Sequence, residues 1–454
     1  MQKYQAYAEY KDSGVEWLGD VPEHWKIAGF KKYLGSIVDY RGKTPEKMDS
    51  GIFLVTARNI KNGIIDYSLS QEYVALKDYA QIMFRGKPKV GDVLFTTEAP
   101  LGEVAQVDDD NIALAQRVIK FRGQNNILEN TFLKYFIMST QFQDSLKTFA
   151  TGSTALGIKA ERLIYLKQCI PAYSEQTQIA NFLDYETAKI DTLIAKQKKL
   201  IDLLKEKRQA VISHAVTKGL DPNVRMKASG VEWLGDVPEH WGIIPLKHIV
   251  TTWKGVAFKA IDFCDDGIKV IKASDIKNKT IRDSAIYLPN NYLNIYSKYL
   301  LKTGDLILST VGSTPDVKNS AVGQIGRVPA FLNGSFLNQN TVVFNAKAIL
   351  DKNYLFFLVQ NNRYRDHLDL NSHGTANQAS LNVADMLDFN IAIPSISEQG
   401  TIAIVLDNQT QKIDNLISKA ETAIKLMQER RTALISSAVT GKIDVRDWQK
   451  PQEA

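Results

Sequence analysis

The stretch Ser13-Gly-Val-Glu-Trp-Leu-Gly-Asp-Val-Pro-Glu-His-Trp25 occurs twice in this chain, the second time at residues 229–241 without a change. A further match without gaps aligns residues 170–221 with residues 393–444, and roughly half of its positions are identical. Solenoid repeats are about 20–50 residues long and come in several copies. Two copies of a domain-sized unit indicate instead a tandem duplication of a globular domain followed by a helix.

The two copies have diverged unevenly. Residues 26–169 and 242–392 share only scattered landmarks, such as Gly91-Asp92 in the first copy and Gly304-Asp305 in the second. The leader (residues 13–25 and 229–241) and the helical segments are close copies. This pattern indicates one structural constraint common to both halves and a different task for each globular part.

Each copy of the second match predicts a long helix. Ser174 and Ser397 are the expected N-caps, and the acids Glu175 and Glu398 follow in the first turn, where the helix dipole favours them. Glycine ends a helix readily because it adopts the left-handed conformation that closes the last turn. The expected C-terminal glycines are Gly219 and Gly441.

The apolar residues of both helices are spaced alternately by four and three, as in a coiled-coil seam of about four heptads. The seam residues are Ile190, Ile194, Ile201, Leu204 and Val211 in the first copy and Ile413, Ile417, Ile424, Met427 and Leu434 in the second. Leu193, Leu200 and Leu203 are expected to widen the stripe. Matching seams favour two antiparallel helices related by a pseudo-twofold axis, with independent packing of each helix as the alternative.

The composition is that of a globular protein of two or three domains, with 454 residues, 44% hydrophobic and 23% charged. No run of 18 apolar residues and no signal-peptide pattern occurs, and the two cysteines, Cys169 and Cys264, form no C-x-x-C motif. These features favour a reducing, cytoplasmic location without a disulfide framework or a structural zinc site. The net charge of +6 permits a polyanionic partner without requiring one.

Motifs for catalysis are not found. Arg41-Gly42-Lys43-Thr44 resembles the end of a phosphate-binding loop, but Ile37 stands where the first glycine is required, so a turn is the better interpretation. Pro315-Asp316-Val-Lys318 resembles a nuclease motif that lacks its second acid, and Pro-Asp is also a common turn pair. The six histidines show no metal-ligand spacing.

The residues of the leader are expected to be structural. Its tryptophans and histidines are predicted to pack at the junction between helix and domain rather than to contact bases or catalyse a reaction. They are Trp17, His24 and Trp25 in the first copy and Trp233, His240 and Trp241 in the second. Thirty helical residues, from Thr187 to Val216, span about 45 Å, compared with about 34–36 Å for one turn of DNA.

The doubled leader, the doubled Pro-x-x-Ser-Glu-Gln helix start and the doubled Ile-Asp-x-Leu-Ile … Arg-x-Ala-(Val/Leu)-Ile-Ser-x-Ala-Val-Thr helix resemble the specificity subunits of type I restriction-modification systems. The resemblance implies a non-catalytic subunit whose two target recognition domains each read half of a bipartite, asymmetric double-stranded DNA site. It implies two methyltransferase subunits docked on the helices and restriction motor-nuclease subunits joined through them. S-adenosylmethionine, ATP and Mg would be held by those partners, and no cofactor or metal by this chain.

The expected fold is therefore α/β (α+β), with two target recognition domains separated by two long antiparallel coiled-coil helices. We expect the following division: domain 1 at residues 1–173, helix 1 at 174–219, domain 2 at 220–396, helix 2 at 397–445 and a tail at 446–454. A coiled-coil scaffold without DNA specificity and a single-chain nuclease or methyltransferase are the alternatives. The bases recognised and the spacer length stay open.

Candidate DNA-binding residues are loop side chains of the kinds that contact base edges and phosphates. In the first domain they are Arg58, Asn59, Lys61, Thr97, Gln116, Arg117, Ser153 and Thr154. In the second domain they are Lys272, Lys277, Asn278, Thr310, Asn338, Gln339, Asn377 and Gln378. For each of them, an ordinary role in a turn or on the surface is the alternative.

Overall fold

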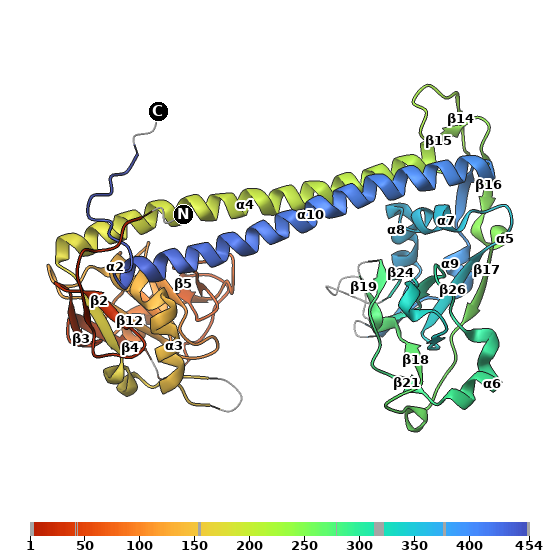
Figure 1. Cartoon of the computed structure of the whole chain (residues 1–454). Helices are drawn as coiled ribbons and strands as arrows, with labels where there is room; N and C mark the ends of the chain where they lie inside the picture. Colours follow the sequence, from red (N-terminus) through yellow and green to blue (C-terminus); the bar gives the residue numbers. More distant parts are fainter. Residues whose placement is uncertain are drawn as a thin grey trace. The chain divides into compact units, whose positions relative to one another are not determined.

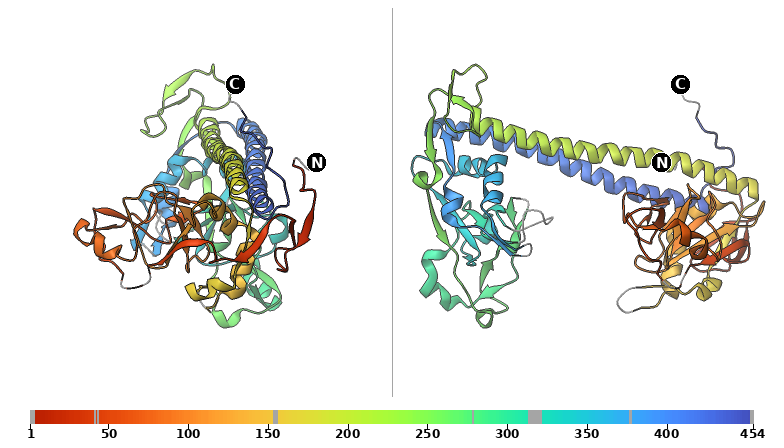
Figure 2. Two further views of the ribbon diagram at one scale, coloured as in Figure 1. Left: turned by 90° about the vertical axis from the view of Figure 1, so that its left-hand side faces the viewer. Right: turned by 180° about the vertical axis from the view of Figure 1, so that it is seen from behind.

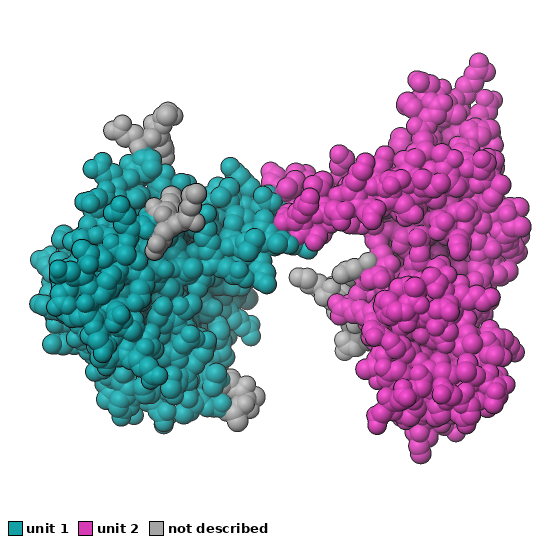
Figure 3. Space-filling model, in the orientation of Figure 1, with its two compact units in different colours: residues 1–198, 421–454 teal, residues 199–420 magenta. Residues whose placement is uncertain are grey.

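The computed structural model describes residues 4–40, 42, 44–152, 156–277, 279–312, 322–375 and 378–451. It divides into two compact units (Figure 3), residues 1–198 with 421–454 and residues 199–420. Each unit contains one globular domain and one half of each of two long helices, α4 (Tyr173–Lys218) and α10 (Ile396–Val439). The boundary therefore falls in the middle of both helices.

The globular domain of the first unit is built around a four-stranded and a three-stranded sheet (Figure 1). Four antiparallel strands form one of them in the order β10-β9-β12-β4, which are Val104–Gln106, Val93–Thr96, Val118–Gly123 and Leu34–Asp39. Three strands form the other in the order β11-β5-β8, which are Ile112–Leu114, Ile52–Val55 and Tyr73–Val74. Strands β11 and β5 run parallel, so the chain leaves both at the same edge.

Two helices complete the core of this domain. α2 (Asn130–Met138) and α3 (Thr140–Phe149) bury Phe132, Phe136 and Phe142 against the four-stranded sheet. The same cluster contains Phe182 of α4, so the domain and the helix share one core.

The second unit repeats this topology with other residues. Its four-stranded sheet has the order β24-β22-β26-β17, which are Ile325–Arg327, Leu306–Ser309, Thr341–Ala346 and Val250–Lys254. Among the described residues this unit has two three-stranded sheets, and the one that matches the first unit has the order β21-β18-β25, which are Tyr287–Leu288, Ile268–Ile271 and Phe336–Leu337. The duplication predicted from the leader and the helices therefore extends through the divergent segments between them.

The two helices run antiparallel in each unit and lie side by side in both views (Figures 1 and 2). In the first unit Arg431 pairs with Asp191 (Nε to Oδ1, 2.9 Å), and in the second Arg208 pairs with Asp414 (2.8 Å). The offset of the repeat is the same for both residues (414 − 191 = 223; 431 − 208 = 223), so the two ion pairs are copies of each other. The same contact between antiparallel helices is therefore present in both units, as the duplication predicts.

The predicted seam is confirmed, but it is narrower than expected. Among the seam residues, those that are buried are Ile190, Ile194, Ile201, Leu204 and Ile413, and those that are partly buried are Val211, Ile417, Ile424, Met427 and Leu434. The prediction for Leu193, Leu200 and Leu203 is wrong, because these side chains are 42–52% exposed. Two helices bury only the stripe that faces the partner helix, and the flanking positions remain in solvent.

The helix ends differ slightly from the prediction. α4 begins at Tyr173 and α10 at Ile396, so Ser174 and Ser397 lie inside the first turn and are not caps. In α10 the cap is Ser395, whose Oγ accepts a hydrogen bond from the backbone N–H of Glu398 (3.3 Å). Ser395, directly after Pro394, is the cap because its side-chain oxygen faces the free N–H groups of the first turn.

The C-terminal ends agree with the glycine prediction. Gly219 (φ +80°) and Gly441 (φ +73°) adopt the left-handed conformation directly after the helices. α10 itself ends at Val439, earlier than the expected residue 445, and the chain then crosses the first unit as a tail. There the backbone N–H of Asp444 donates to the carbonyl of Gln5 (2.8 Å), so this tail contacts the segment that precedes the leader.

The Gly-Asp landmark marks a turn in both units, and among the described residues a buried salt-bridge network is found at the first copy. Asp92 accepts hydrogen bonds from the Lys89 backbone N–H (2.9 Å) and from Arg122 Nε and Nη2 (2.5 and 2.7 Å), and Lys120 Nζ lies 3.3 Å away. Burial alone would raise the pKa of Asp92, but these partners lower it below its usual value. Asp305 accepts from the Lys302 backbone N–H (2.8 Å), and burial raises its pKa.

We therefore expect Asp92→Asn to destabilise the first unit by about 3 kcal/mol, because Lys120 and Arg122 lose their buried counter-charge. The folded-state pKa of Asp92 is depressed, so its contribution is present at neutral pH and is lost as pH falls below about 4. Urea unfolding at pH 7 and pH 3, followed by hydrogen exchange in each unit, measures the loss of stability and its dependence on pH. Asp305→Asn is the control and should be neutral or slightly stabilising; an equal loss in both variants contradicts the prediction.

Candidate nucleic-acid interface

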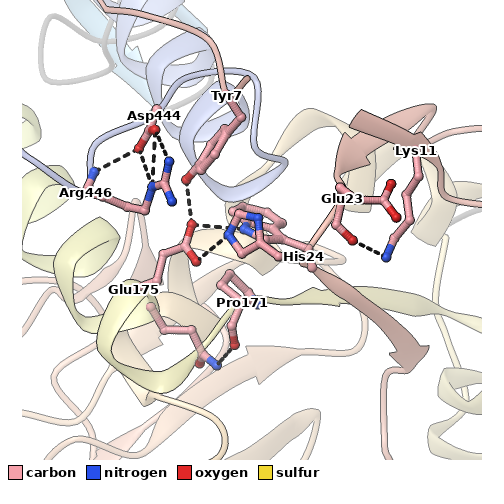
Figure 4. A network of polar contacts seen from close by, with 10 residues as sticks. Tyr7, Lys11, Glu23, His24, Pro171, Glu175, Asp444 and Arg446 are labelled. Atoms are coloured by element: carbon pink, nitrogen blue, oxygen red, sulfur yellow. Dashed lines mark hydrogen bonds and ion pairs between the residues drawn. The ribbon is translucent and has the colours of Figure 1, made fainter. Parts of the chain in front are cut away.

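The leader is a clamp between the ends of the two helices (Figure 4). Glu175, in the first turn of α4, accepts hydrogen bonds from Trp25 Nε1 (3.0 Å) and Tyr7 Oη (2.7 Å), and His24 Nε2 lies 2.9 Å from its other oxygen. Lys442, just beyond α10, donates to the carbonyl of Asp20 (2.6 Å). The leader therefore touches the start of one helix and the end of the other.

The second unit repeats this clamp. Glu398 accepts from Trp241 Nε1 (3.1 Å) and lies 2.9 Å from His240 Nε2, and Lys218 donates to the carbonyl of Asp236. Trp25 and Trp241 are fully buried. The structural role predicted for these tryptophans and histidines is confirmed. Because the contacts of Trp25, His24 and Asp20 with the helix ends recur at Trp241, His240 and Asp236, the clamp also explains why the leader is copied without change.

The polar residues of the first domain gather where the parallel strands β5 and β11 end. Val55 pairs with Leu114, so the loops that follow bring Arg58 beside Gln116 and Arg117. These side chains line a hollow of about 260 Å³ together with Thr44, Lys47, Thr56, Ser70 and Glu72. Three of the predicted residues, from two distant segments, therefore share one site.

A second hollow of about 610 Å³ lies next to the first, because Thr44 and Gln116 line both. Gln116 Nε2 donates to Thr44 Oγ1 (2.7 Å), which fixes its amide at the boundary. The second hollow is also lined by Tyr40, Phe84 and Arg85, and Phe84 is 74% exposed. An exposed aromatic ring next to cations is suited to stacking on a sugar or base.

The cations of this face are held only loosely. Lys47 pairs with Glu72 (2.9 Å) and Arg117 with Glu98 (2.9 Å), and the side chains of Lys47 and Arg117 are about half exposed. Exposed ion pairs contribute about 0–1 kcal/mol, so a phosphate can replace either carboxylate at low cost. Arg117 also has a positive φ of 78°, which is rare for a residue with a side chain and marks a constrained loop.

Other predicted residues of the first domain do not lie on this face. Asn59 is fully buried: its Oδ1 accepts from the N–H and hydroxyl of Thr56, and its Nδ2 donates to the carbonyls of Asp66 and Leu69. Thr97 is buried and donates to the carbonyl of Arg117 (3.2 Å). Both side chains shape the loops and offer no free group to a base. Lys61 is exposed on a separate hairpin, and Ser153 and Thr154 lie outside the described residues.

The second domain has an equivalent edge. Strands β18 and β25 are parallel, with Ile271 paired to Leu337, so Lys272 follows one strand and Asn338 and Gln339 follow the other. The backbone N–H of Asn338 donates to the carbonyl of Ile271 (2.9 Å), which holds the two loops together. Gln339 is exposed, and Lys272 and Asn338 are partly exposed.

The remaining predictions in the second domain have mixed outcomes. Thr310 is buried, and its backbone N–H donates to the carbonyl of Asn340 (2.9 Å), so it corresponds to Thr97 and is structural. Lys277 is exposed on a hairpin away from this edge. The predicted residues Asn278 and Asn377, the side chain of Gln378 and the Pro315-Asp316-Val-Lys318 motif lie outside the described residues.

The two edges carry different side chains on one scaffold. Thr97 and Thr310 donate their backbone N–H to Arg117 and Asn340, which fixes the correspondence. Gln116 therefore corresponds to Gln339. The next residue is Arg117 in the first domain and Asn340 in the second. Arginine and asparagine favour different base edges, guanine and adenine respectively.

Sequence reasoning missed Thr44, Lys47, Phe84 and Arg85, which line the two hollows. A signal was present for Thr44, since the segment Arg41-Gly42-Lys43-Thr44 combines basic and hydroxyl side chains in a turn, although Arg41 and Lys43 lie outside the described residues.

Within the described ranges, no group of three or more His, Cys, Asp or Glu side chains is arranged to hold a metal ion. None of the helices in that part of the chain is long and apolar enough to cross a membrane.

Comparison with known proteins identifies relatives along most of the chain. A family model described as the type I restriction modification DNA specificity domain matches residues 31–203 and 238–426. The type I restriction enzyme MjaVIII specificity subunit of Methanocaldococcus jannaschii is 23% identical over 449 residues, which covers 94% of this chain and 95% of the relative. The EcoKI specificity subunit of Escherichia coli K12 is 26% identical over 228 residues, about half of each chain (48% and 47%).

Solved structures show the same fold. One chain from a structure of type I R-M system assembly and conformational transition aligns with a TM-score of 0.68 at 15% identity, covering 93% of this chain and 99% of that one. The HsdS subunit from Thermoanaerobacter tengcongensis aligns with a TM-score of 0.50 at 16% identity, covering 93% and 98%.

Proposed function

Because the chain belongs to the type I restriction modification DNA specificity domain family, we propose that each of its globular domains recognises one half of a bipartite, asymmetric double-stranded DNA site. The proposal is carried by one observation: the loops that follow β5 and β11 in the first domain have counterparts after β18 and β25 in the second. Gln116 and Arg117 at the first edge correspond in place to Gln339 and Asn340 at the second, and Lys272 stands at the second edge where the first has Thr56. Two domains that share a fold but differ in their contact residues require a DNA site whose two halves differ.

The chain itself supplies recognition and assembly. The leaders and the outer faces of α4 and α10 would dock two methyltransferase subunits, and the motor-nuclease subunits would join through these. The copied helices support this proposal because identical docking surfaces require identical residues. S-adenosylmethionine, ATP and Mg belong in the partner subunits, and the continuous helices, 46 and 44 residues long, would set the spacer of the DNA site.

Gln116 and Gln339 allow a matched test of this function. The complex of the chain with its methyltransferase subunits would be supplied with a genomic library, and single-molecule sequencing would map the methylated sites. We expect Gln116→Ala to relax one half-site and Gln339→Ala the other, each by about tenfold, since a base contact by a side-chain amide is worth about 1–3 kcal/mol. Each variant controls for the other.

Other outcomes distinguish the alternatives. Methylation of unrelated sequences at equal rates, at fixed salt, identifies a scaffold without specificity. Methyl transfer or cleavage by the purified chain alone identifies an enzyme. Relaxation of both half-sites by a single variant contradicts the assignment of one domain to each half.

A further inference from the structure

A short hairpin of the first domain contacts the helix pair at one guanidinium group. The hairpin consists of β6 (Ile60–Lys61) and β7 (Ile64–Ile65), with Asn62 in its turn. Arg431 on α10 donates from Nη2 to the carbonyl of Asn62 (3.3 Å), while its Nε bonds both oxygens of Asp191 on α4 (2.9 and 3.2 Å). One side chain therefore joins both helices and the globular domain.

The hairpin turn is firmly attached to the rest of its domain. The backbone N–H of Gly63 donates to the carbonyl of Val104 (2.9 Å), and the N–H of Gln106 donates to the carbonyl of Gly63 (3.2 Å). Both partners belong to strand β10 of the four-stranded sheet. The turn and the four-stranded sheet are therefore expected to move together, because these hydrogen bonds join them.

The second unit has the equivalent junction in altered form. Arg208 bonds Asp414 (Nε to Oδ1, 2.8 Å; Nη2 to Oδ2, 3.2 Å) and donates from Nη1 to Gln360 Oε1 (3.3 Å). The facing hairpin consists of β19 (Ile276–Lys277) and β20 (Thr280–Ile281). This hairpin packs tightly against Gly326 of strand β24, because a Cβ atom added to Gly326 would lie 2.9–3.2 Å from atoms of the hairpin.

Lys279 is the residue that distinguishes this second junction. It occupies the place of Gly63 and keeps the left-handed conformation (φ +64°, against +92° for Gly63), at a cost of about 1–2 kcal/mol for a residue with a side chain. Burial and the charge of Arg208 lower its pKa to about 8, against a smaller opposing effect of Asp414. A lysine therefore lies near the arginine in both units: Lys279 in the second, and in the first Lys134, whose pKa is lowered by burial and more weakly by the charge of Arg431.

We propose that Arg431 and Arg208 are positioning residues that hold each globular domain in a fixed orientation on its own helix segments and thereby restrict the spacer lengths that the protein accepts. This inference rests on the proposed function. In the first unit Arg431 donates directly to the backbone of the hairpin, and among the described residues of the second unit Arg208 donates to the side chain of Gln360. We therefore expect loss of Arg431 to have the larger effect.

The test measures methylation of duplexes that carry the wild-type site with its native spacer or with one base pair added or removed. In Arg431→Ala we expect the preference for the native spacer to fall by about tenfold, the size expected for the loss of a charge-assisted hydrogen bond, while the bases of both half-sites stay the same. Arg431→Lys should be intermediate, because an ammonium group lacks the fork that binds two acceptors in fixed geometry.

The adjacent exposed residue supplies the control. Arg430→Ala removes the same charge one position away and should leave the spacer preference unchanged. Arg208→Ala, with Lys207→Ala as its control, should weaken the preference less than Arg431→Ala does. Equal loss of methylation at every spacer length, or equal spacer preference in Arg431→Ala and Arg430→Ala, overturns the proposal.

A second measurement keeps the two proposals distinguishable. Hydrogen exchange of amides 60–65 in the free chain should be faster in Arg431→Ala than in Arg430→Ala, because the turn loses its anchor on the helices. If the wild-type complex shows no sequence preference, the DNA function fails, and this exchange result still decides whether Arg431 holds the hairpin. Unchanged exchange shows that it does not.

Discussion

Exchanging residues 26–169 for the corresponding domain of another family member is expected to change the bases read in one half of the DNA site and to leave the other half unaltered. The two ends of the exchanged segment lie side by side, because β3 (Lys26–Gly29) pairs with β13 (Lys167–Ile170). The domain therefore enters and leaves the scaffold at a single place. Its replacement leaves the leader and both helices intact.

The effect should be large, since specific sites are bound about 10³–10⁷ times more tightly than random DNA. Methylation mapping of the hybrid with the original methyltransferase subunits measures it directly. The reciprocal exchange of residues 242–392 is the control, because β16 (Gly242–Pro245) and β29 (Asn390–Ile393) pair in the same way. A hybrid in which both half-sites change would show that the domains do not read independently.

Replacing Glu175 by alanine is expected to destabilise the first unit by about 3 kcal/mol. The carboxylate is nearly buried, with its side chain 6% exposed, and its loss leaves Trp25 Nε1 and the Tyr7 hydroxyl without their acceptor in the core. Burial and the hydrogen bond to Glu175 also raise the pKa of Tyr7, so the phenol remains a donor throughout the accessible pH range.

Glu398→Ala is the natural control, because Glu398 has the same place in the second unit. Its side chain is 31% exposed, and among the described residues its hydrogen-bond partners are Trp241 and His240. Water can replace part of this interaction, so a loss of about 1 kcal/mol is expected. Urea unfolding followed by hydrogen exchange of peptides from each unit separates the two effects, and equal losses would contradict the role assigned to burial.

The divergent domains show how far the candidate site could be predicted. Residue type selected Arg58, Gln116 and Arg117, which line one hollow in the structure, because arginine and glutamine in loops next to apolar strands are suited to the surface. Their contact with DNA stays a prediction. The same reasoning selected Asn59 and Thr97, which are buried. Asparagine and threonine stabilise turns as readily as they contact bases, and only the surrounding strands decide which role they have.

The duplication, the antiparallel helix pair and the structural role of the leader could be predicted from the residues alone. These features depend on local spacing: a repeat every four and three residues defines a helix face, and identical segments indicate a shared structural role. Which loop residues converge could not be predicted in this way. The parallel pairing of β5 with β11 and of β18 with β25 brings distant loops to one edge, and strand pairing of this kind depends on contacts between segments far apart in the chain rather than on the residues of either loop.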